Sequence, residues 1–496
     1  MHSRNLYHHH GKKMMNQYLE SLKPFYDIVI IGSGLGGLSA ANYLGKLGHS
    51  VLLLEQHFQL GGLAAWFRRK GGHIFDTSLH GFPAGMIKSC RKYWSQEIAN
   101  AIVQLKRIRF INPQFSLKTS FTREDFSRIL IEHFGISPST VEAFFKNLRE
   151  MNFYDNSQET TRNIFEKFFP KRDDIHRFLL EPIAYANGSG LEDPAISYGI
   201  VFSNFMDRGV YTFEGGTDHL IEVMTNELLS HGVDIRTRCQ VEEILVGGLE
   251  QPSVIGVRVG DTFIPCRIVI SNANIIKTIE HYLHPSILRG DLETQRQQVR
   301  INTSSCQVYL GIKSGEVIPD IGDLIFYSEN DHFGSDELLD FHTKSRTFSI
   351  YYPKTRPQNE PHYTIVASMN ARWEDWNSLD EISYRREKER MIEDTTMALE
   401  KLIPGIRSKI DWKEAATPKT FHRYTGHPKG TSFGTKFEGL NISMHLSEYI
   451  HGLYHTGSVG IIMSGWLGAM NYGIITAHKI AGILCKKNDF AELLKQ

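Results

Sequence analysis

The sequence has no excess of charge of either sign. Its 496 residues include 55 Lys or Arg and 55 Asp or Glu, so the formal net charge at pH 7 is zero. Proteins that hold nucleic acid through their overall charge need a surplus of Lys and Arg to contact phosphates. The balance argues against that class, and we expect no nucleic-acid partner. The apolar share of 41% is that of an ordinary globular protein with ample chain for large cores.

Cysteine is scarce and scattered. The chain has five cysteines, at positions 90, 239, 266, 306 and 485. This odd set contains no CxxC pair, and it does not resemble the even, regular pattern of an extracellular disulfide framework. We therefore expect no structural metal and a reducing environment. A cytoplasmic protein is the prediction, with contact at a membrane surface as an open alternative.

The N-terminal residues 1–24 contain no apolar segment of the kind that secretory signals carry. We expect this part to be a tail. His8, His9 and His10 lie within it, and three histidines on a terminal arm are more typical of a solvated segment than of a metal site.

A clear membrane span is missing too, although residues 457–477 run for 21 positions without a formal charge. That length would suffice for a transmembrane helix. The stretch holds five glycines, and each glycine costs roughly 1 kcal/mol in a helix relative to alanine. A glycine-rich loop that leads into a buried helix is therefore the better prediction.

The first strong pattern is a βαβ unit near the N-terminus. An apolar run at residues 27–31 predicts a strand that is buried on both faces. Glycines follow at 32–37, then a helix-forming segment at 38–44 that Gly48 ends, and a second apolar strand at 49–55. The unit spans about 30 residues, as βαβ units do.

The turn of this unit matches the GxGxxG pattern of dinucleotide-binding proteins. Gly32 would permit the tight turn, Gly34 would let a pyrophosphate approach the backbone, and Gly37 would let the helix pack closely on the strand. Glu55 ends the second strand 18 residues after Gly37, where a carboxylate accepts hydrogen bonds from a ribose. The alternative is a glycine-rich turn with an accidental acid. The strand before the motif and the helix after it favour the dinucleotide site.

The remaining chain predicts insertions into this nucleotide domain. Residues 94–205 look mostly helical and rich in aromatic residues, and a charged helix is expected at 381–402. Strands are expected at 233–246, 253–270, 304–313 and 362–369. The predicted fold class is α/β, with a Rossmann-like three-layer domain and an inserted mixed substrate domain. The proposed pieces are a tail at 1–24, the nucleotide domain at 25–93, 206–290 and 440–496, and the substrate or lid domain at 94–205 and 291–439.

Further motifs resemble a known family. After Glu55 come Gly61 and Gly62, and then a Gly-x-x-Phe-Asp segment that ends at Asp76. This order is similar to that of the large FAD-dependent family containing amine oxidases, phytoene desaturases, carotenoid isomerases and retinol saturases. The family often has an arginine after the glycine pair, where this sequence has Leu63.

The resemblance implies FAD as the cofactor and extends over most of the chain. Segments at 211–216, 268–274 and 452–457 are similar to the family's cofactor-domain segments, and backbone groups of Val241 would contact the adenine. The residues that the resemblance and the motif together assign to the cofactor are Gly32, Ser33, Gly34, Leu35, Gly36, Gly37, Glu55, Gln56, Gly62, Leu63, Val241, Asn272, Gly457, Ser458, Trp466 and Leu467.

The C-terminal helix also has a physical reason to face a flavin. A reduced flavin carries negative charge near N1 and the C2 carbonyl, and free N–H groups around Gly465, Trp466 and Leu467 would stabilise that charge. The family commonly places an acid after the loop glycine, and Ser458 stands there instead.

Several details resemble the polyene branch of this family, including Tyr384 and Lys388, Thr417-Pro418 with Arg423, and the segment at 430–434. The resemblance implies an FAD-dependent oxidoreductase, a desaturase, saturase or isomerase, that acts on C=C or C–C bonds of an apolar polyene or a carotenoid- or retinoid-like lipid. Two alternatives stay open: a flavin amine oxidase on a small amine, and a non-catalytic flavoprotein scaffold.

Candidates for proton transfer are few. His80 follows the flavin-side segment, and Arg423 lies near the Pro418 loop, so these two are the predicted catalytic residues. Only one GxGxxG follows a strand, so we expect any redox partner to bind transiently. An apolar substrate dissolves in membranes, which makes peripheral membrane contact an expectation as well.

Overall fold

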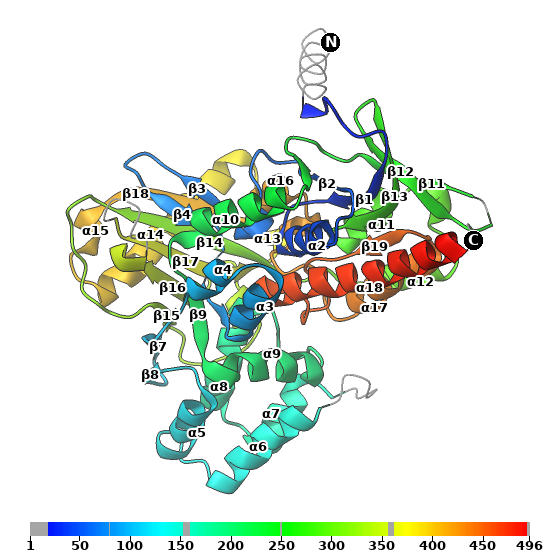
Figure 1. The fold of residues 1–496 in the computed structure, drawn as a ribbon. Coiled ribbons are helices and arrows are strands. Elements are labelled where there is room, and N and C mark those ends of the chain that lie inside the picture. Colours follow the sequence, from blue (N-terminus) through cyan, green and yellow to red (C-terminus); the bar gives the residue numbers. More distant parts are fainter. Residues whose placement is uncertain (1–17, 79, 152–158, 249, 356–361, 494–496) are drawn as a thin grey trace.

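The computed structural model describes residues 18–78, 80–151, 159–248, 250–355 and 362–493. The histidines at 8–10, and most of the predicted tail, lie outside the described residues. Figure 1 shows two large sheets beside each other and a group of helices, α5 to α7, that lies farthest from the N-terminal strand.

The first large sheet confirms the predicted βαβ unit. Its strands run parallel at the centre, and the first half of β13 continues into an antiparallel extension. In spatial order they are β10 (Asp234–Arg236), β2 (Val51–Leu54), β1 (Tyr26–Ile31) and β13 (Thr262–Ser271). β19 (Leu453–His455) also pairs with β13. The extension consists of β12 (Ser253–Val259) and β11 (Glu243–Gly247).

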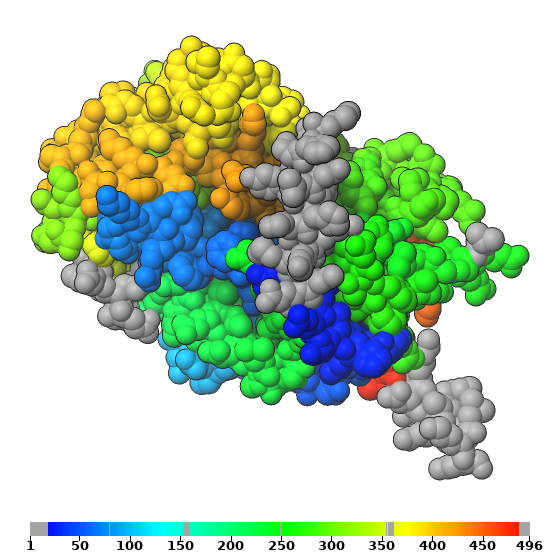
Figure 2. Space-filling model, turned by 90° about the horizontal axis from the view of Figure 1, so that it is seen from above, coloured from blue at the N-terminus to red at the C-terminus, as the bar shows by residue number. Residues whose placement is uncertain are grey.

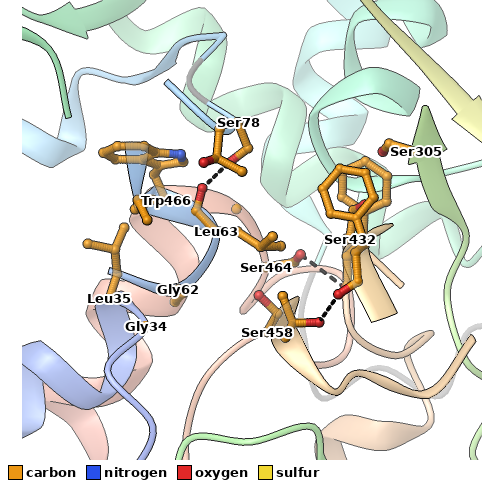
Figure 3. A pocket seen from close by; sticks show the side chains of 18 of the residues that line it. Gly34, Leu35, Gly62, Leu63, Ser78, Ser305, Ser432, Ser458, Ser464 and Trp466 are labelled. Carbon is orange, nitrogen blue, oxygen red and sulfur yellow. Dashed lines mark hydrogen bonds between the residues drawn. The ribbon is translucent and has the colours of Figure 1, made fainter. Parts of the chain in front are cut away.

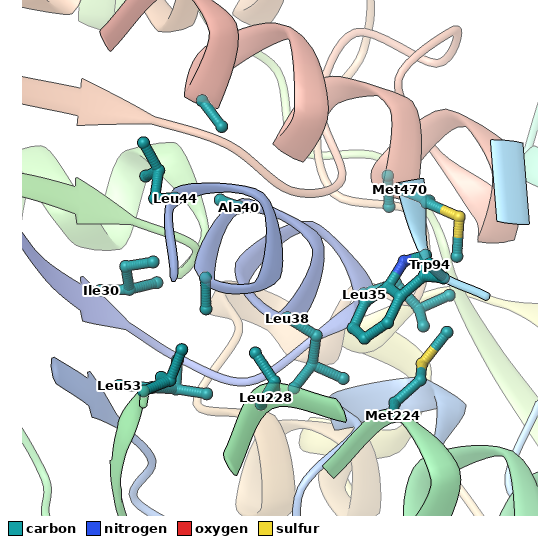
Figure 4. Close-up of a cluster of buried hydrophobic side chains, with 14 of the residues drawn as sticks. Ile30, Leu35, Leu38, Ala40, Leu44, Leu53, Trp94, Met224, Leu228 and Met470 are labelled. Carbon is teal, nitrogen blue, oxygen red and sulfur yellow. The ribbon is translucent and has the colours of Figure 1, made fainter. Parts of the chain in front are cut away.

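Helices cover both faces of this sheet, which gives the predicted three layers. On one face α2 (Leu35–Lys46) packs against α18 (Gly465–Leu493) and α10 (Gly216–Ser230). In Figure 4, Ile30 and Leu53 of the sheet lie to the left of Leu38 and Ala40 of α2, with Leu228 and Met470 from the other two helices. Side chains of α11 (Ile275–His281) and α17 (Gly439–Tyr449) cover the opposite face.

The core of the nucleotide domain extends past the predicted boundary at residue 93. Trp94, Ile98 and Ile102 belong to the same buried cluster as α2. They come from α3 (Gly85–Tyr93) and the elements after it: α4 (Gln96–Asn100) and β6 (Ile102–Gln104). β6 pairs with β9 (Val210–Phe213), which also pairs with β5 (Phe82–Pro83). This small sheet joins the two predicted domains.

The second large sheet forms the floor of the substrate domain. Its strands in spatial order are β18 (Ile410–Ala416), β14 (Ser304–Ile312), β17 (Thr364–Ala371), β16 (Arg346–Tyr351), β15 (Leu324–Tyr327), β7 (Ile108–Ile111) and β8 (Ser116–Thr119). The predicted strands at 304–313 and 362–369 are confirmed, and α14 (Glu381–Leu402) has the predicted bounds. Residues 94–205 are mostly helical, as predicted, and they also contain the three short strands β6, β7 and β8.

A helical cap follows these strands. It consists of α5 (Arg123–Glu132), α6 (Pro138–Glu150), α7 (Thr161–Phe168), α8 (Asp173–Asn187) and α9 (Ala195–Arg208). The hydroxyls of Thr122, Ser137 and Thr160 cap the first three of these helices. The aromatic residues of these helices pack against one another, as in the stacked pair of Phe126 and Phe178, whose ring centroids are 4.3 Å apart.

Shorter elements connect the two sheets. They are β3 (Trp66–Arg68), β4 (Ile74–Asp76), α12 (Asp291–Gln298), α13 (Trp373–Asn377), α15 (Ile406–Lys409) and α16 (Pro418–Thr425). In Figure 2 the blue segment that contains β3 and β4 lies against the orange segment that contains β18 and α16. Arg69 donates two hydrogen bonds to Glu414 across this contact, at 2.5 and 2.7 Å.

The uncharged run at 457–477 forms a loop followed by the first half of α18, as predicted. Among the described residues, no helix combines the length and the hydropathy that crossing a bilayer requires.

Candidate functional site

The turn after β1 has the geometry of a phosphate-binding loop. Gly32 has a φ of +93°, which glycine adopts without strain, and Gly34 is the N-cap of α2. No side chain caps this helix, so the N–H groups of its first turn are left for a ligand. The loop lies at the carboxyl end of the parallel strands, where open α/β sheets bind their ligands.

Asn272 locks this loop against the C-terminal loop. It follows β13, and its Nδ2 donates to the carbonyl of Gly32 at 3.3 Å. A Cβ atom at Gly34 would lie 2.9 Å from that nitrogen, and one at Gly36 would lie 2.7 Å from the Oδ1 atom. Gly457, with a φ of +103°, meets the same oxygen from the other side. These glycines are therefore required by close packing as well as by any ligand.

Gly36 and Gly37 are fixed by packing in a second way. A Cβ at Gly37 would overlap the carbonyl oxygen of Gly32, which confirms the predicted close approach of helix and strand. Gly36 is in backbone contact with Gly473 of α18, because a Cβ at Gly473 would overlap its carbonyl oxygen. The sequence reading did not anticipate this contact between the two helices.

Glu55 sits at the end of β2 with its carboxylate anchored. It is 7% exposed. One oxygen accepts from the backbone N–H and the hydroxyl of Ser33, at 2.8 and 2.6 Å, and the other accepts from the N–H of His57 at 2.8 Å. Oε2 has used both of its lone pairs, whereas Oε1 keeps one, so the carboxylate can still accept from a ribose hydroxyl. Lys277 lies nearby, and burial lowers its pKa although Glu55 opposes this.

One large cavity connects these groups. Its volume is about 1270 Å³, above the range of about 300–1,000 Å³ that a single drug-sized ligand uses. All the predicted cofactor residues except Gly37 line it. Figure 3 shows Gly34, Gly62, Leu63 and Trp466 on one side of this space and Ser305, Ser432, Ser458 and Ser464 on the other.

The start of α18 forms one wall of the cavity. Trp466 stacks on Phe82 at 5.8 Å between ring centroids, and Leu467 lies beside it in the first turn. The carbonyl of Leu63 accepts from the hydroxyl of Ser78 at 2.6 Å, which fixes the loop opposite this helix. The first residues of α18 therefore line the same cavity as the glycine loop before α2.

The cavity continues into an apolar region beneath the helical cap. The second sheet contributes Leu324 and Phe326, the cap contributes apolar residues such as Ile183, Val201 and Phe205, and Phe121 lies just before the cap. Most of the other phenylalanines in the cap form its core.

His80 lies where the two domains meet. Its Nδ1 is 2.9 Å from the hydroxyl of Ser349, and its Nε2 is 3.0 Å from the hydroxyl of Ser368. Burial lowers the pKa of His80 to about 4, although Asp76 opposes this effect. The ring is therefore neutral at pH 7, with both nitrogens engaged by serines of the second sheet. A role in proton transfer stays a prediction.

Arg423 occupies a different part of the cavity. It is exposed on α16, and its guanidinium lies 5.7 Å from the ring of Tyr424. His80 belongs to the boundary with the second sheet, so the two predicted catalytic residues come from separate elements. A catalytic role for Arg423 also stays a prediction.

Tyr309 and Gln307, on β14, are site residues that sequence reasoning missed. Tyr309 is 2% exposed, and its hydroxyl contacts Gln307 and the carbonyl of Thr77. Gln307 lies 3.3 Å from Nε2 of His80. Both line the cavity. No motif marks them, because only the pairing of β14 with distant strands brings them there.

A buried acid lies behind the cavity wall. Glu181 is 1% exposed, and its Oε1 has no hydrogen-bond partner among the described residues. Burial raises the pKa of Glu181 to about 8; Arg177, one turn earlier on α8, lowers it, and Glu337 raises it further. Tyr185, one turn later on the same face, lines the cavity. No motif in the sequence marks this acid.

Comparison with known proteins supports the nucleotide domain first. Residues 30–95 match the family model of an NAD(P)-binding Rossmann-like domain. That region contains β1, the glycine loop, α2 and Glu55.

Curated relatives match almost the whole chain. A chloroplastic prolycopene isomerase of Daucus carota is 25% identical, with 92% of this chain and 80% of the relative covered. An all-trans-retinol 13,14-reductase of Danio rerio is 23% identical, with 92% of this chain and 85% of the relative covered.

Solved structures share the fold. The cyclohexylamine oxidase of Brevibacterium oxydans has a TM-score of 0.63 at 11% identity, with 94% of this chain and 99% of that one covered. The predicted fold class is therefore confirmed.

Proposed function

We propose that this chain binds FAD and acts on carbon–carbon bonds of an apolar polyene or a carotenoid- or retinoid-like lipid. The chain belongs to the family of FAD-dependent phytoene desaturases, carotenoid isomerases and retinol saturases, and it is an oxidoreductase of that type. The observation that carries the proposal is the continuity of one cavity, which leads from the dinucleotide loop to the apolar region under the cap.

The residues present fit FAD at the adenosine end. The glycine loop offers free N–H groups at the start of α2 for a diphosphate, and a Cβ at Gly34 or Gly36 would close that space. Glu55 would hold the ribose, and Val241 would line the adenine site.

The flavin end fits as well. The first turn of α18, with Trp466 and Leu467, would face the ring, and the loop at Leu63 would cover it from the other side. FAD, when bound, supplies the two-electron transfer that oxidises or reduces a carbon–carbon bond. The chain itself supplies the apolar walls that exclude water, through residues such as Phe121, Phe205 and Phe326.

His80 has a defined part in this proposal. As a neutral ring it holds Ser349 and Ser368 and orients Gln307 toward Tyr309. These groups line the cavity between its two parts, where they would fix the substrate relative to the cofactor.

The amine oxidase alternative receives less support from the aromatic residues. An amine site beside a flavin needs an aromatic cage, and Tyr424 and Trp466 are two aromatic residues that line the cavity. Tyr424 is 52% exposed and packs edge-on against His57, whereas Trp466 stacks on Phe82. Within the described residues the two rings form no pair with each other.

The test uses both oxidation states of the protein. The purified protein, reduced with dithionite under anaerobic conditions, is mixed with a carotene and with retinol. The oxidised protein is mixed in air with the same polyenes and with a small primary amine, and all products are separated by chromatography. We expect isomerised or saturated polyene and an unchanged amine. Turnover of the amine alone, or of none of the three, would contradict the proposal.

The proposal includes peripheral contact with a membrane, because an apolar polyene must enter the cavity from a lipid phase. Flotation with liposomes tests this part. We expect some of the protein to rise with the vesicles, and protein that stays entirely at the bottom would count against it.

A further inference from the structure

Two lysines from different helices converge on one aromatic ring at the edge of the cavity. The ammonium of Lys388, on α14, lies 5.7 Å from the centroid of the Tyr384 ring, and that of Lys419, on α16, lies 4.8 Å from it. The hydroxyl of Tyr384 is 2.8 Å from that of Thr417, the N-cap residue of α16, which fixes the ring between the two helices.

Arg423 adds a third cation one helical turn after Lys419, on the same face of α16. All three side chains line the cavity, and within the described part of the chain none forms an ion pair with a carboxylate. The acids in this region are already engaged, because Glu414 pairs with Arg69 and Glu381 pairs with Arg385.

Such an arrangement is costly unless an anion offsets it. Lys388 and Lys419 are half-buried, so water screens their mutual repulsion less than at an open surface. Cation–π contact with one ring offsets only a small part of that cost at sites of this exposure. Three unpaired cations beside a cavity favour an anion that carries several charges.

We infer that Lys388, Lys419 and Arg423 form a phosphate-binding site that takes the phosphate groups of a nucleotide. Lysine ammoniums and a guanidinium are the donors that phosphate oxygens prefer. The phosphates come from one of two sources: the diphosphate of the resident dinucleotide, or a second nucleotide that binds transiently. The first source rests on the proposed binding of FAD, and the second does not. Direct measurement of pyrophosphate binding together with flavin content distinguishes a failure of this site from a failure of the proposed function.

The experiment measures phosphate binding directly. The double variant Lys388→Gln/Lys419→Gln removes two charges and keeps polar side chains of similar length. Lys413→Gln is the matched control, because Lys413 is exposed on the neighbouring strand β18 and does not line the cavity. Calorimetry with inorganic pyrophosphate is carried out on the protein as isolated and after removal of any bound nucleotide, and bound flavin is measured for each variant.

We expect the double variant to bind pyrophosphate at least about tenfold more weakly than the unmodified chain, as the loss of charge-assisted hydrogen bonds implies. The control should bind it equally well. If the site serves the resident dinucleotide, the double variant also loses flavin, and pyrophosphate binds only after the nucleotide is removed. If the site serves a second nucleotide, flavin content is unchanged, and pyrophosphate and NADPH compete for the protein as isolated.

Equal pyrophosphate affinity in the double variant and the unmodified chain, with equal flavin content, would overturn the inference. Circular dichroism and the melting temperature establish that the double variant is folded. If it is not, Arg423→Gln tests the same site, because Arg423 is exposed and, within the described part of the chain, its guanidinium lies over the ring of Tyr424 and forms no ion pair.

Discussion

Replacing Glu181 by Gln is expected to stabilise the protein increasingly as the pH rises. Burial raises the pKa of this acid from 4.5 to about 8. The charged groups around it are Arg177 on its own helix and Glu337 across the contact, and neither ion-pairs with it within the described residues. Arg177 instead donates to the backbone carbonyls of Asn330 and His332.

The sign of the effect follows from proton linkage. Below pH 4.5 the folded and the unfolded chain both hold the proton on Glu181. Between pH 4.5 and about 8 only the folded chain holds it, so the free energy of unfolding falls as the pH rises through this window. At about 1.36 kcal/mol for each pH unit, the penalty at pH 8 is on the order of 5 kcal/mol. Gln does not titrate, so the variant escapes this penalty.

Urea denaturation at a series of pH values in this window measures the effect. The slope with pH is the test, because a buried amide with an unpaired donor adds a constant cost of about 1–3 kcal/mol. Across the window we expect the free energy of unfolding of the variant to rise by several kcal/mol relative to that of the unmodified chain. The control Glu389→Gln, exposed on α14, should show no gain. Parallel curves for Glu181→Gln and the unmodified chain would refute the reasoning.

Two further predictions concern the dinucleotide loop. Gly37→Ala should destabilise the protein by at least about 2 kcal/mol, since the new methyl group overlaps the carbonyl of Gly32, whereas Gly482→Ala on α18, which meets nothing within 4 Å, should be neutral or slightly stabilising. Equal melting temperatures for these two variants would contradict that packing argument. Glu55→Gln should weaken dinucleotide binding about tenfold or more, as judged by equilibrium dialysis, because the charged acceptor is lost. Unchanged affinity would mean that this carboxylate does not hold the ribose.

The βαβ unit was predictable because its signals are local. The apolar run before Gly32, the helix after it and the terminal glycine at position 48 each act within a few residues, and all are confirmed. The same is true of α14, whose bounds follow from its charge pattern and the Pro404-Gly405 stop.

The boundary of the nucleotide domain was harder to predict from the sequence. Residues 94–104 complete its core, because Trp94 and Ile102 pack under α2 and β6 pairs with β9 about 110 residues later. In the same way β7 joins the second sheet through β15, more than 200 residues away. Pairing over such distances leaves no periodic signal in either segment.

The residues of the candidate site fall into the same two groups, those that a local pattern marks and those that only the fold brings together. Gly34, Glu55 and Trp466 could be assigned because a motif or a resemblance marks them, and they line one cavity. Tyr309, Glu181 and the lysine pair around Tyr384 could not, since their roles depend on which side chains the fold brings opposite them. The contact of Gly36 with Gly473 is of the same kind.

The most direct test of the account is the absorption spectrum of the freshly isolated protein, followed by quantification of any released nucleotide. The account predicts a yellow protein with flavin bands and close to one FAD per chain, or uptake of that amount when FAD is added. A colourless protein that takes up no flavin would contradict the central claim that the loop after β1 and the start of α18 hold the two ends of one dinucleotide.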